Sequence, residues 1–230
     1  ARCHKSKETS GGGLSINRGE SARGGFADMW KKEKKQETQE VSPEKEEGRD
    51  LYEWAQALVC SVLAVVLLFT FVIRLIGVDG HSMVPTLQDG DRLLVLNAML
   101  DNDYEYGDIV VLRKDTFLEE PIVKRVIATE GQTVDIDFTA GAVYVDGQLL
   151  EEDYIRQPTY LEEGLEFPVT VPEGCVFVMG DNRNDSDDSR DPELGPVDTR
   201  QILGRAVFLL FPGVTADTDK RDFGRIGPLT

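Results

Sequence analysis

The stretch WAQALVCSVLAVVLLFTFVI, residues 54–73, decides how this chain is organised, because twenty consecutive positions carry no charged side chain. At a rise of about 1.5 Å per residue, a helix of this length spans roughly 30 Å, which matches the hydrocarbon of a bilayer. The alternative is a buried core helix, but such helices usually keep one polar face. We therefore expect a single transmembrane helix within residues 51–76.

The residues on either side of this run indicate its orientation. Residues 1–50 are rich in Gly, Ser, Glu and Lys and lack apolar periodicity, which is typical of a disordered tail. After Arg74 the next basic residue is Arg92, whereas four basic residues lie shortly before the run: Lys34, Lys35, Lys45 and Arg49. The positive-inside rule therefore predicts a cytoplasmic tail, a single pass through the cell membrane and an extracytoplasmic domain at residues 77–230.

The pattern beyond residue 77 is that of a β-domain. Seven runs rich in Val, Ile, Leu and aromatic residues are bounded by Gly, Asp and Pro and predict strands: residues 92–96, 109–112, 122–128, 133–136, 142–145, 175–179 and 206–211. Asp146-Gly147 predicts a tight hairpin turn. We expect a mainly β fold, in which a partly barrel-like antiparallel β domain follows the single N-terminal transmembrane helix.

The charge of the chain limits its partners. The formal net charge is −17, and from residue 77 onward 31 acidic side chains face 13 basic ones. Binding to nucleic acid needs clustered Lys and Arg against phosphates, so DNA and RNA are excluded as expected partners.

The three cysteines lie in separate contexts without C-x-x-C spacing, so neither a zinc site nor a disulfide scaffold is indicated. The oligomeric state is left open by the sequence.

The stretch GHSMVPTL, residues 80–87, contains a candidate nucleophile in Ser82. A serine hydroxyl needs a general base, and the chain contains only two histidines. His81 adjoins Ser82, so in extended chain the two side chains point to opposite faces. His4 lies on the other side of the apolar run, which leaves lysine as the base.

Lys124 is the lysine best suited to this role. It lies in the run IVKRVIA, residues 122–128, where aliphatic neighbours would remove its hydration and lower the pKa of its amine. The alternative is a lysine on an edge strand that extends its amine to solvent.

The stretch GDNRNDSDDSR, residues 180–190, is dense in side chains that suit a hydrogen-bonded loop. An EF-hand starting at Asp181 would place Arg183 at position three and Pro192 where a glutamate ligand belongs. Calcium binding is therefore not expected, and no metal or cofactor is predicted. A solvated acidic loop is the other interpretation of this segment.

Four motifs in order resemble the motif set of bacterial type I signal peptidases. They are Ser-Met-x-Pro-Thr-Leu, Gly-Asp-Ile-Val-Val, Lys-Arg-Val-Ile and Gly-Asp-Asn-Arg-x-x-Ser-x-Asp-Ser-Arg, and the resemblance covers roughly residues 54–212. The resemblance implies a membrane-anchored Ser/Lys endopeptidase that cleaves signal peptides of exported preproteins after Ala-x-Ala-type ends. It implies that Ser82 is the nucleophile, Lys124 the general base and Ser186 the residue that orients the lysine amine. The supporting polar network would consist of Asp188, Arg190 and Arg125.

The resemblance also implies an oxyanion hole and a substrate groove. The backbone N–H of Ser82 is the expected oxyanion donor, and Gly80 stands where some family members have a serine hydroxyl as the second donor. Met83 and Val123 are expected to line the substrate pockets, with core packing as the alternative for both. The single span, Gly80 and the lone downstream Cys175 resemble the Gram-positive form of the enzyme.

Two other functions are compatible with parts of this pattern. A self-cleaving repressor-like protease would share the Ser/Lys chemistry, but it needs a DNA-binding domain in place of a membrane span. A membrane-tethered, non-catalytic binding or scaffolding protein would carry the same motifs as a vestigial site.

Overall fold

The computed structural model describes residues 43–118, 120–215, 218 and 220–229, with side chains from residue 49 onward. The chain divides into two compact units, residues 1–58 and 59–230, and each is described by itself. The expected disordered tail lies mostly outside the described residues.

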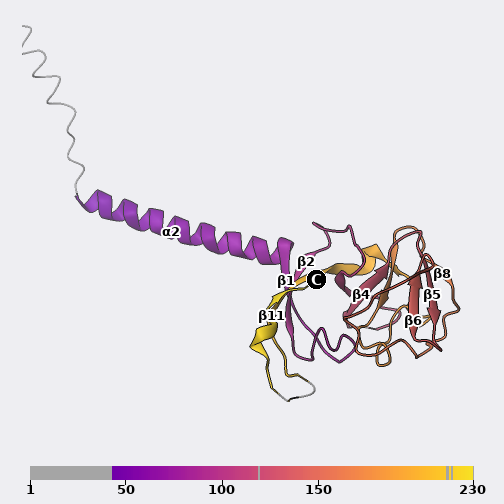
Figure 1. Ribbon diagram of the computed structural model, residues 1–230. Helices are drawn as coiled ribbons and strands as arrows, with labels where there is room; N and C mark the ends of the chain where they lie inside the picture. The colour runs from indigo at the N-terminus through magenta and orange to yellow at the C-terminus, as the bar shows by residue number, and fades with distance from the viewer. Residues whose placement is uncertain (1–42, 119, 216–217, 219, 230) are drawn as a thin grey trace, which may run out of the picture. The chain divides into compact units, whose positions relative to one another are not determined.

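The first described element is the helix α2, Pro43–Leu67, which continues as a π-helical turn, η1, at Leu68–Val72 (Figure 1). Its first residues, 43–50, fall in the stretch that was expected to be disordered, and they are helical in this structure. Proline at the first helical position and acidic residues just after it favour a helix start here. Residues 49–72 are long and apolar enough to cross a membrane.

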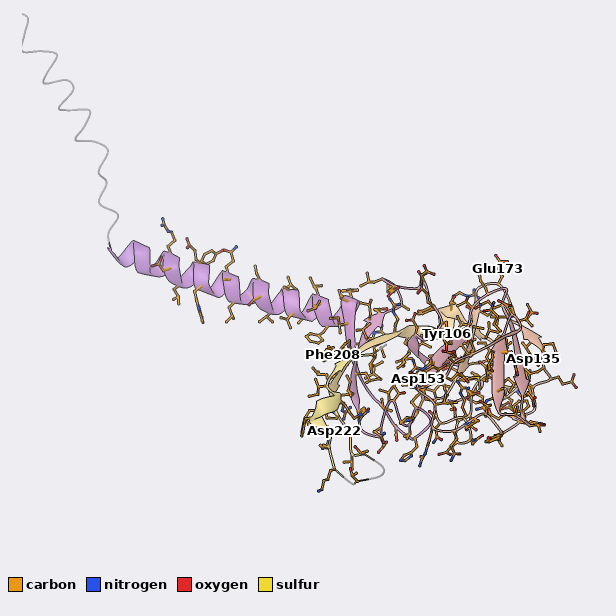
Figure 2. All side chains as sticks on the ribbon, viewed as in Figure 1. Tyr106, Asp135, Asp153, Glu173, Phe208 and Asp222 are labelled. Atoms are coloured by element: carbon orange, nitrogen blue, oxygen red, sulfur yellow. The ribbon has the colours of Figure 1, made fainter. Side chains whose placement is uncertain are left out.

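None of this span is buried against the rest of the described chain, which contradicts the alternative of a buried core helix. Apolar side chains stand out along the helix with their surfaces exposed (Figure 2). The helix ends where Ile73 takes up extended backbone. Residues 73–76, which were expected to belong to the membrane segment, instead lie in β1, the first strand of the sheet, which ends at Gly77.

The larger sheet is antiparallel and has the strand order β1-β2-β11-β3-β4-β9-β10, with β12 paired to β11. The strands are β1 (Ile73–Gly77), β2 (Arg92–Asn97), β3 (Ile109–Leu112), β4 (Ile122–Ala128), β9 (Cys175–Met179), β10 (Val197–Asp198), β11 (Ile202–Phe211) and β12 (Gly227–Pro228). The register of β11 against β2 shifts after Ala206 and again after Leu209. Such bulges bend a strand, and the sheet curls into a half-barrel.

The smaller sheet has the order β7-β6-β5-β8, and β5, β6 and β8 lie side by side in Figure 1. Its strands are β5 (Thr133–Asp137), β6 (Ala142–Val145), β7 (Gln148–Leu149) and β8 (Val169–Thr170). Asp146 and Gly147 have φ angles of 52° and 76°, as a two-residue hairpin turn requires, so the predicted hairpin is confirmed. Short 3₁₀ turns occur at Thr199–Gln201 (η2) and Phe223–Arg225 (η3).

The mainly antiparallel β fold behind one long apolar helix is therefore confirmed. Each of the seven predicted strands is present, and the strands without a predicted counterpart are short or lie at sheet edges. For the site, the important feature is the place of β4. It pairs with β3 on one side and β9 on the other, so it is an interior strand.

Candidate active site

Ser82 lies in the loop that joins β1 to β2. The two ends of this loop are tied together by hydrogen bonds from the Val78 N–H to Asp91 O (2.8 Å) and from the Gly90 N–H to Val78 O (2.9 Å). Gly80 adopts a φ of 97°, which favours glycine, and thereby turns the chain two residues before Ser82. The serine is thus presented by a loop, residues 78–91, that is fastened at its base.

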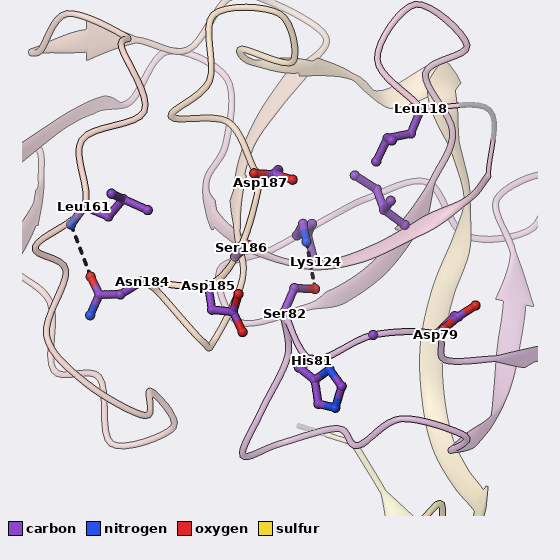
Figure 3. Close-up of a pocket in the computed structure, with 12 residues that line it drawn as sticks. Asp79, His81, Ser82, Leu118, Lys124, Leu161, Asn184, Asp185, Ser186 and Asp187 are labelled. Atoms are coloured by element: carbon purple, nitrogen blue, oxygen red, sulfur yellow. Dashed lines mark hydrogen bonds between the residues drawn. The ribbon is translucent and has the colours of Figure 1, made fainter. Parts of the chain in front are cut away.

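Lys124 projects from β4 toward this serine, and its Nζ lies 2.8 Å from Ser82 Oγ (Figure 3). Lys124 is only 3% exposed, which contradicts the alternative of an edge-strand lysine in solvent. Burial lowers the pKa of the amine below its usual value, because an ammonium ion loses its hydration there. The carboxylates of Asp188, Asp187 and Glu163 act against this shift.

Ser82 and Lys124 both line a cleft of about 390 Å³. Figure 3 shows the side chains around it, which come from the Ser82 loop, from β4 and from the loop after β9, with Leu118 from the β3–β4 connection and Leu161 from the segment between β7 and β8. The lining includes several polar and acidic groups: Asp79, His81, Asn184, Asp185, Ser186 and Asp187. Ser82 and Lys124 are therefore reachable by a ligand although the lysine itself is buried.

The loop after β9 is built around the buried carboxylate of Asp188. This carboxylate accepts hydrogen bonds from the Gly180 N–H (2.9 Å), the Ser186 hydroxyl (3.0 Å) and the Arg190 guanidinium (2.8 Å). Burial alone would raise the pKa of Asp188, but the hydrogen bonds and charge of Arg190 hold it below its ordinary value. Asp188 is thus an ionised anchor for the loop.

Ser186 reaches the same cleft as Lys124, but its hydroxyl donates to Asp188. Among the described residues, the Nζ of Lys124 has its hydrogen bond with Ser82 and none with Ser186. The direct Ser186–Lys124 hydrogen bond expected from the resemblance is therefore not formed in this structure.

Arg125 takes part in a different network from Asp188 and Arg190. Its Nε and Nη2 donate to the two carboxylate oxygens of Asp181, each at 2.9 Å, and all of these groups are buried. Asp181 also accepts the Thr86 hydroxyl at 2.5 Å, and the guanidinium stacks 4.1 Å from the centre of the Tyr154 ring. This network joins the Ser82 loop, β4 and the loop after β9 behind the cleft.

Sequence reasoning missed three acidic residues that pair with buried arginines around the site. Asp181 stood within the Gly-Asp-Asn-Arg motif, so its pairing with an arginine could have been considered. Glu152 forms an ion pair with Arg183, and Glu163 forms one with Arg190. Both glutamates belong to the segment between β7 and β8, which carries no motif that points to them.

The backbone N–H groups of Ser82 and Gly80, the two residues considered for an oxyanion hole, differ in whether they are already engaged. The Ser82 N–H donates no hydrogen bond to any described residue, so it is free to meet a ligand. The Gly80 N–H donates to Asp89 Oδ1 at 2.9 Å and is therefore already engaged.

Met83 and Val123 both line a second pocket, of about 290 Å³, which also reaches Ser82. Its other apolar walls come from Ile76, Val78, Pro121 and Ile122. Met83 and Val123 also belong to the same buried core cluster. They thus pack in the core and form the floor of an apolar depression beside the serine.

No group of three or more His, Cys, Asp and Glu side chains within residues 43–118, 120–215, 218 and 220–229 is arranged to hold a metal ion. The described site offers a hydroxyl beside a buried amine, flanked by an open backbone N–H and an apolar pocket.

The chain is similar to known proteins along most of its length. Residues 51–211 match the family described as "Signal peptidase, peptidase S26". The signal peptidase I of Bacillus licheniformis is 36% identical over 185 residues, covering 76% of this chain and 95% of that protein. The probable signal peptidase I-1 of Synechocystis is 40% identical, covering 67% of this chain and 79% of that protein.

A solved structure of a signal peptidase I from Enterococcus faecalis is 29% identical and covers 45% of this chain and 96% of that one, with a TM-score of 0.37. The family match spans well over half of the chain and includes the Ser82 loop, β4 and the loop after β9. The chain therefore belongs to the signal peptidase I family, the S26 serine peptidases.

Proposed function

We propose that this protein is a membrane-anchored serine endopeptidase that removes N-terminal signal peptides from exported preproteins after small residues of the Ala-x-Ala type. The observation that carries this proposal is the 2.8 Å distance between Ser82 Oγ and the buried Nζ of Lys124. A hydroxyl becomes a nucleophile when a base with a suitable pKa lies within hydrogen-bond reach.

In the first step, the neutral amine of Lys124 takes the hydroxyl proton of Ser82 as Oγ attacks the carbonyl carbon after the last residue of the signal peptide. The negative charge that develops on the carbonyl oxygen is stabilised by the free N–H of Ser82. When the peptide bond breaks, the Lys124 ammonium returns the proton to the amine of the mature protein. The signal peptide is left as an ester on Ser82.

In the second step, a water molecule loses a proton to Lys124 and attacks the ester carbonyl. The ester bond breaks, Ser82 regains its proton and the signal peptide leaves with a new carboxylate. The same amine therefore serves both halves of the reaction, which requires it to be neutral at the start of each.

The substrate would bind as an extended strand across the mouth of the site. The apolar pocket formed by Met83, Val123 and their neighbours lies beside Ser82 and has room for small side chains at positions −1 and −3. Ser186, Asp188, Arg190 and Arg125 would hold the elements that carry the catalytic pair.

The membrane placement is part of the proposal. The helical segment of residues 49–72 is suited to span a bilayer, with residues 1–50 on the cytoplasmic side and residues 77–230 on the extracytoplasmic side. A protease added to intact spheroplasts is expected to digest the C-terminal domain. Protection of that domain would contradict this orientation.

The function is tested with the full-length protein in detergent and a preprotein that carries an Ala-x-Ala boundary. Mass spectrometry is expected to find two fragments separated by a cut directly after the second alanine. A matched preprotein with leucine at position −1 is expected to remain intact. The proposal would be overturned if the first preprotein were not cut, or if both were cut equally.

A further inference from the structure

The segment between β7 and β8 is fastened along the loop that carries Ser186. Asn184 Oδ1 accepts the Leu161 N–H at 3.1 Å (Figure 3), the Arg190 Nη1 donates to Leu161 O at 3.0 Å, and the Leu165 N–H donates to Arg190 O at 2.9 Å. Glu163 lies between these contacts. Its side chain is 9% exposed, so this carboxyl group is almost fully removed from solvent.

The contacts of Glu163 satisfy its carboxylate only in part. Oε2 accepts the Asp188 N–H at 3.2 Å, and Oε1 lies 2.7 Å from Arg190 Nη2. However, Nη2 directs its hydrogen bonds to Asp188 Oδ2 and Ser186 O, and Oε1 is left without one from the described residues. A buried carboxylate oxygen without a hydrogen bond favours the protonated acid. Burial, followed by the charge of Asp188, raises the pKa of Glu163 to about 7.

The charge of Glu163 matters because of what surrounds Lys124. Asp188, Asp187 and Glu163 favour the ammonium form of the lysine, whereas Arg190 opposes it. Asp188 is held ionised by its hydrogen bonds with Arg190, so its charge is constant near neutral pH. Other charged or titratable groups line the cleft: Asp79, His81 and Asp185. Among the buried groups Asp188, Arg190 and Glu163, Glu163 is therefore the one whose charge can change near neutral pH.

We propose that Glu163 is a positioning residue with two effects. It holds Arg190 against Asp188, and its charge sets how readily the amine of Lys124 gives up its proton. The inference rests on the proposed role of Lys124 as the general base. Loss of the Glu163 charge leaves the carboxylates of Asp188 and Asp187 against the guanidinium of Arg190, which removes one of the interactions that stabilise the ammonium. The neutral, active amine then persists to lower pH.

The test compares kcat/KM against pH for the full-length enzyme and its Glu163→Gln and Glu162→Gln variants, with the Ala-x-Ala preprotein. Both substitutions remove one negative charge at neighbouring positions, but Glu162 is exposed. Glu163→Gln is expected to move the acid limb of the profile down by about 0.5 to 1 pH unit, because a nearby carboxylate no longer favours the ammonium. Glu162→Gln is expected to leave the limb in place.

A merely structural role would lower kcat/KM at every pH without moving the limb, and that result would overturn the inference while leaving the peptidase function intact. If kcat/KM of the wild-type enzyme did not fall toward acid pH, both the inference and the proposed peptidase function would be overturned. Glu163→Asp keeps the charge and is expected to retain the wild-type limb. If the glutamine variant does not fold, the aspartate variant alone provides the test. An acid limb of its kcat/KM profile that moved down by about 1 pH unit, although the charge is kept, would contradict the charge mechanism.

Discussion

The Nζ of Lys124 lies 2.8 Å from the Oγ of Ser82, although the two residues are 42 positions apart in the chain. The lysine comes from an interior strand and the serine from a loop tied at its base, so both partners are held by the folded domain. Such preorganisation limits the motion that would separate a nucleophile from its base.

The first prediction concerns pH. The pKa of Lys124 is lowered by burial, and only the neutral amine can accept the serine proton. Activity is therefore expected to fall as the pH decreases through this lowered pKa, by about tenfold per pH unit below it. The measurement is kcat/KM for preprotein cleavage between pH 5 and pH 10. A profile that stays flat toward acid pH would show that no such base is used.

The second prediction concerns the buried Arg125–Asp181 pair. Arg125→Met leaves the Asp181 carboxylate without its bidentate partner, which typically costs about 3 to 5 kcal/mol. The thermal midpoint in detergent is expected to fall by several degrees and activity to fall with it. Arg200→Met is the control, because Arg200 pairs with Asp198 on the surface. Equal midpoints for the two variants would contradict the structural role of the buried pair.

The third prediction concerns substrate choice. Val123→Ala enlarges the apolar pocket beside Ser82, so a preprotein with valine at −1 is expected to gain about tenfold in kcat/KM relative to one with alanine. Val95→Ala is the matched control, since Val95 lies in the same core cluster but does not line the pocket. If both variants changed the ratio alike, Val123 would act through core packing and not through the pocket.

The fourth prediction concerns Gly80. Its φ of 97° disfavours any residue with a Cβ, although a Cβ there would have no atom within 4 Å. Gly80→Ala is therefore expected to destabilise the protein by about 1 kcal/mol through backbone strain alone. Gly227→Ala has equal space without a positive φ and is expected not to destabilise. Differential scanning fluorimetry of the two variants measures the difference, and identical midpoints would argue against strain at Gly80.

Much of the architecture could be predicted from local sequence. The strand β4 follows directly from the run IVKRVIA, whose aliphatic residues also indicate why its lysine is buried. The helix start at Pro43 was missed because the polar composition before residue 50 outweighed the proline and acidic residues that begin a helix. The strand β1 was missed because its apolar residues continue the membrane run, and only pairing with β2 distinguishes them.

The polar networks could not be predicted in the same way, because their partners are distant in sequence. Arg125 was grouped with Asp188 and Arg190, but in the fold it meets Asp181, 56 positions away. Glu163 lies in a segment without motif or periodicity, and its contact with Arg190 arises only when that segment packs along the loop. Local patterns therefore singled out Ser82 and Lys124, which the fold brings together, whereas the groups proposed to tune the amine required three-dimensional placement.

The most direct measurement is single-turnover cleavage of an Ala-x-Ala preprotein by the wild-type enzyme and by the Ser82→Ala, Lys124→Ala and Lys220→Ala variants. Lys220 is an exposed lysine away from the cleft and serves as the control. We expect wild-type cleavage from Lys220→Ala and none from the other two, because the hydroxyl and the amine act as a unit. Cleavage that persisted in either Ser82→Ala or Lys124→Ala would contradict the catalytic role of this pair.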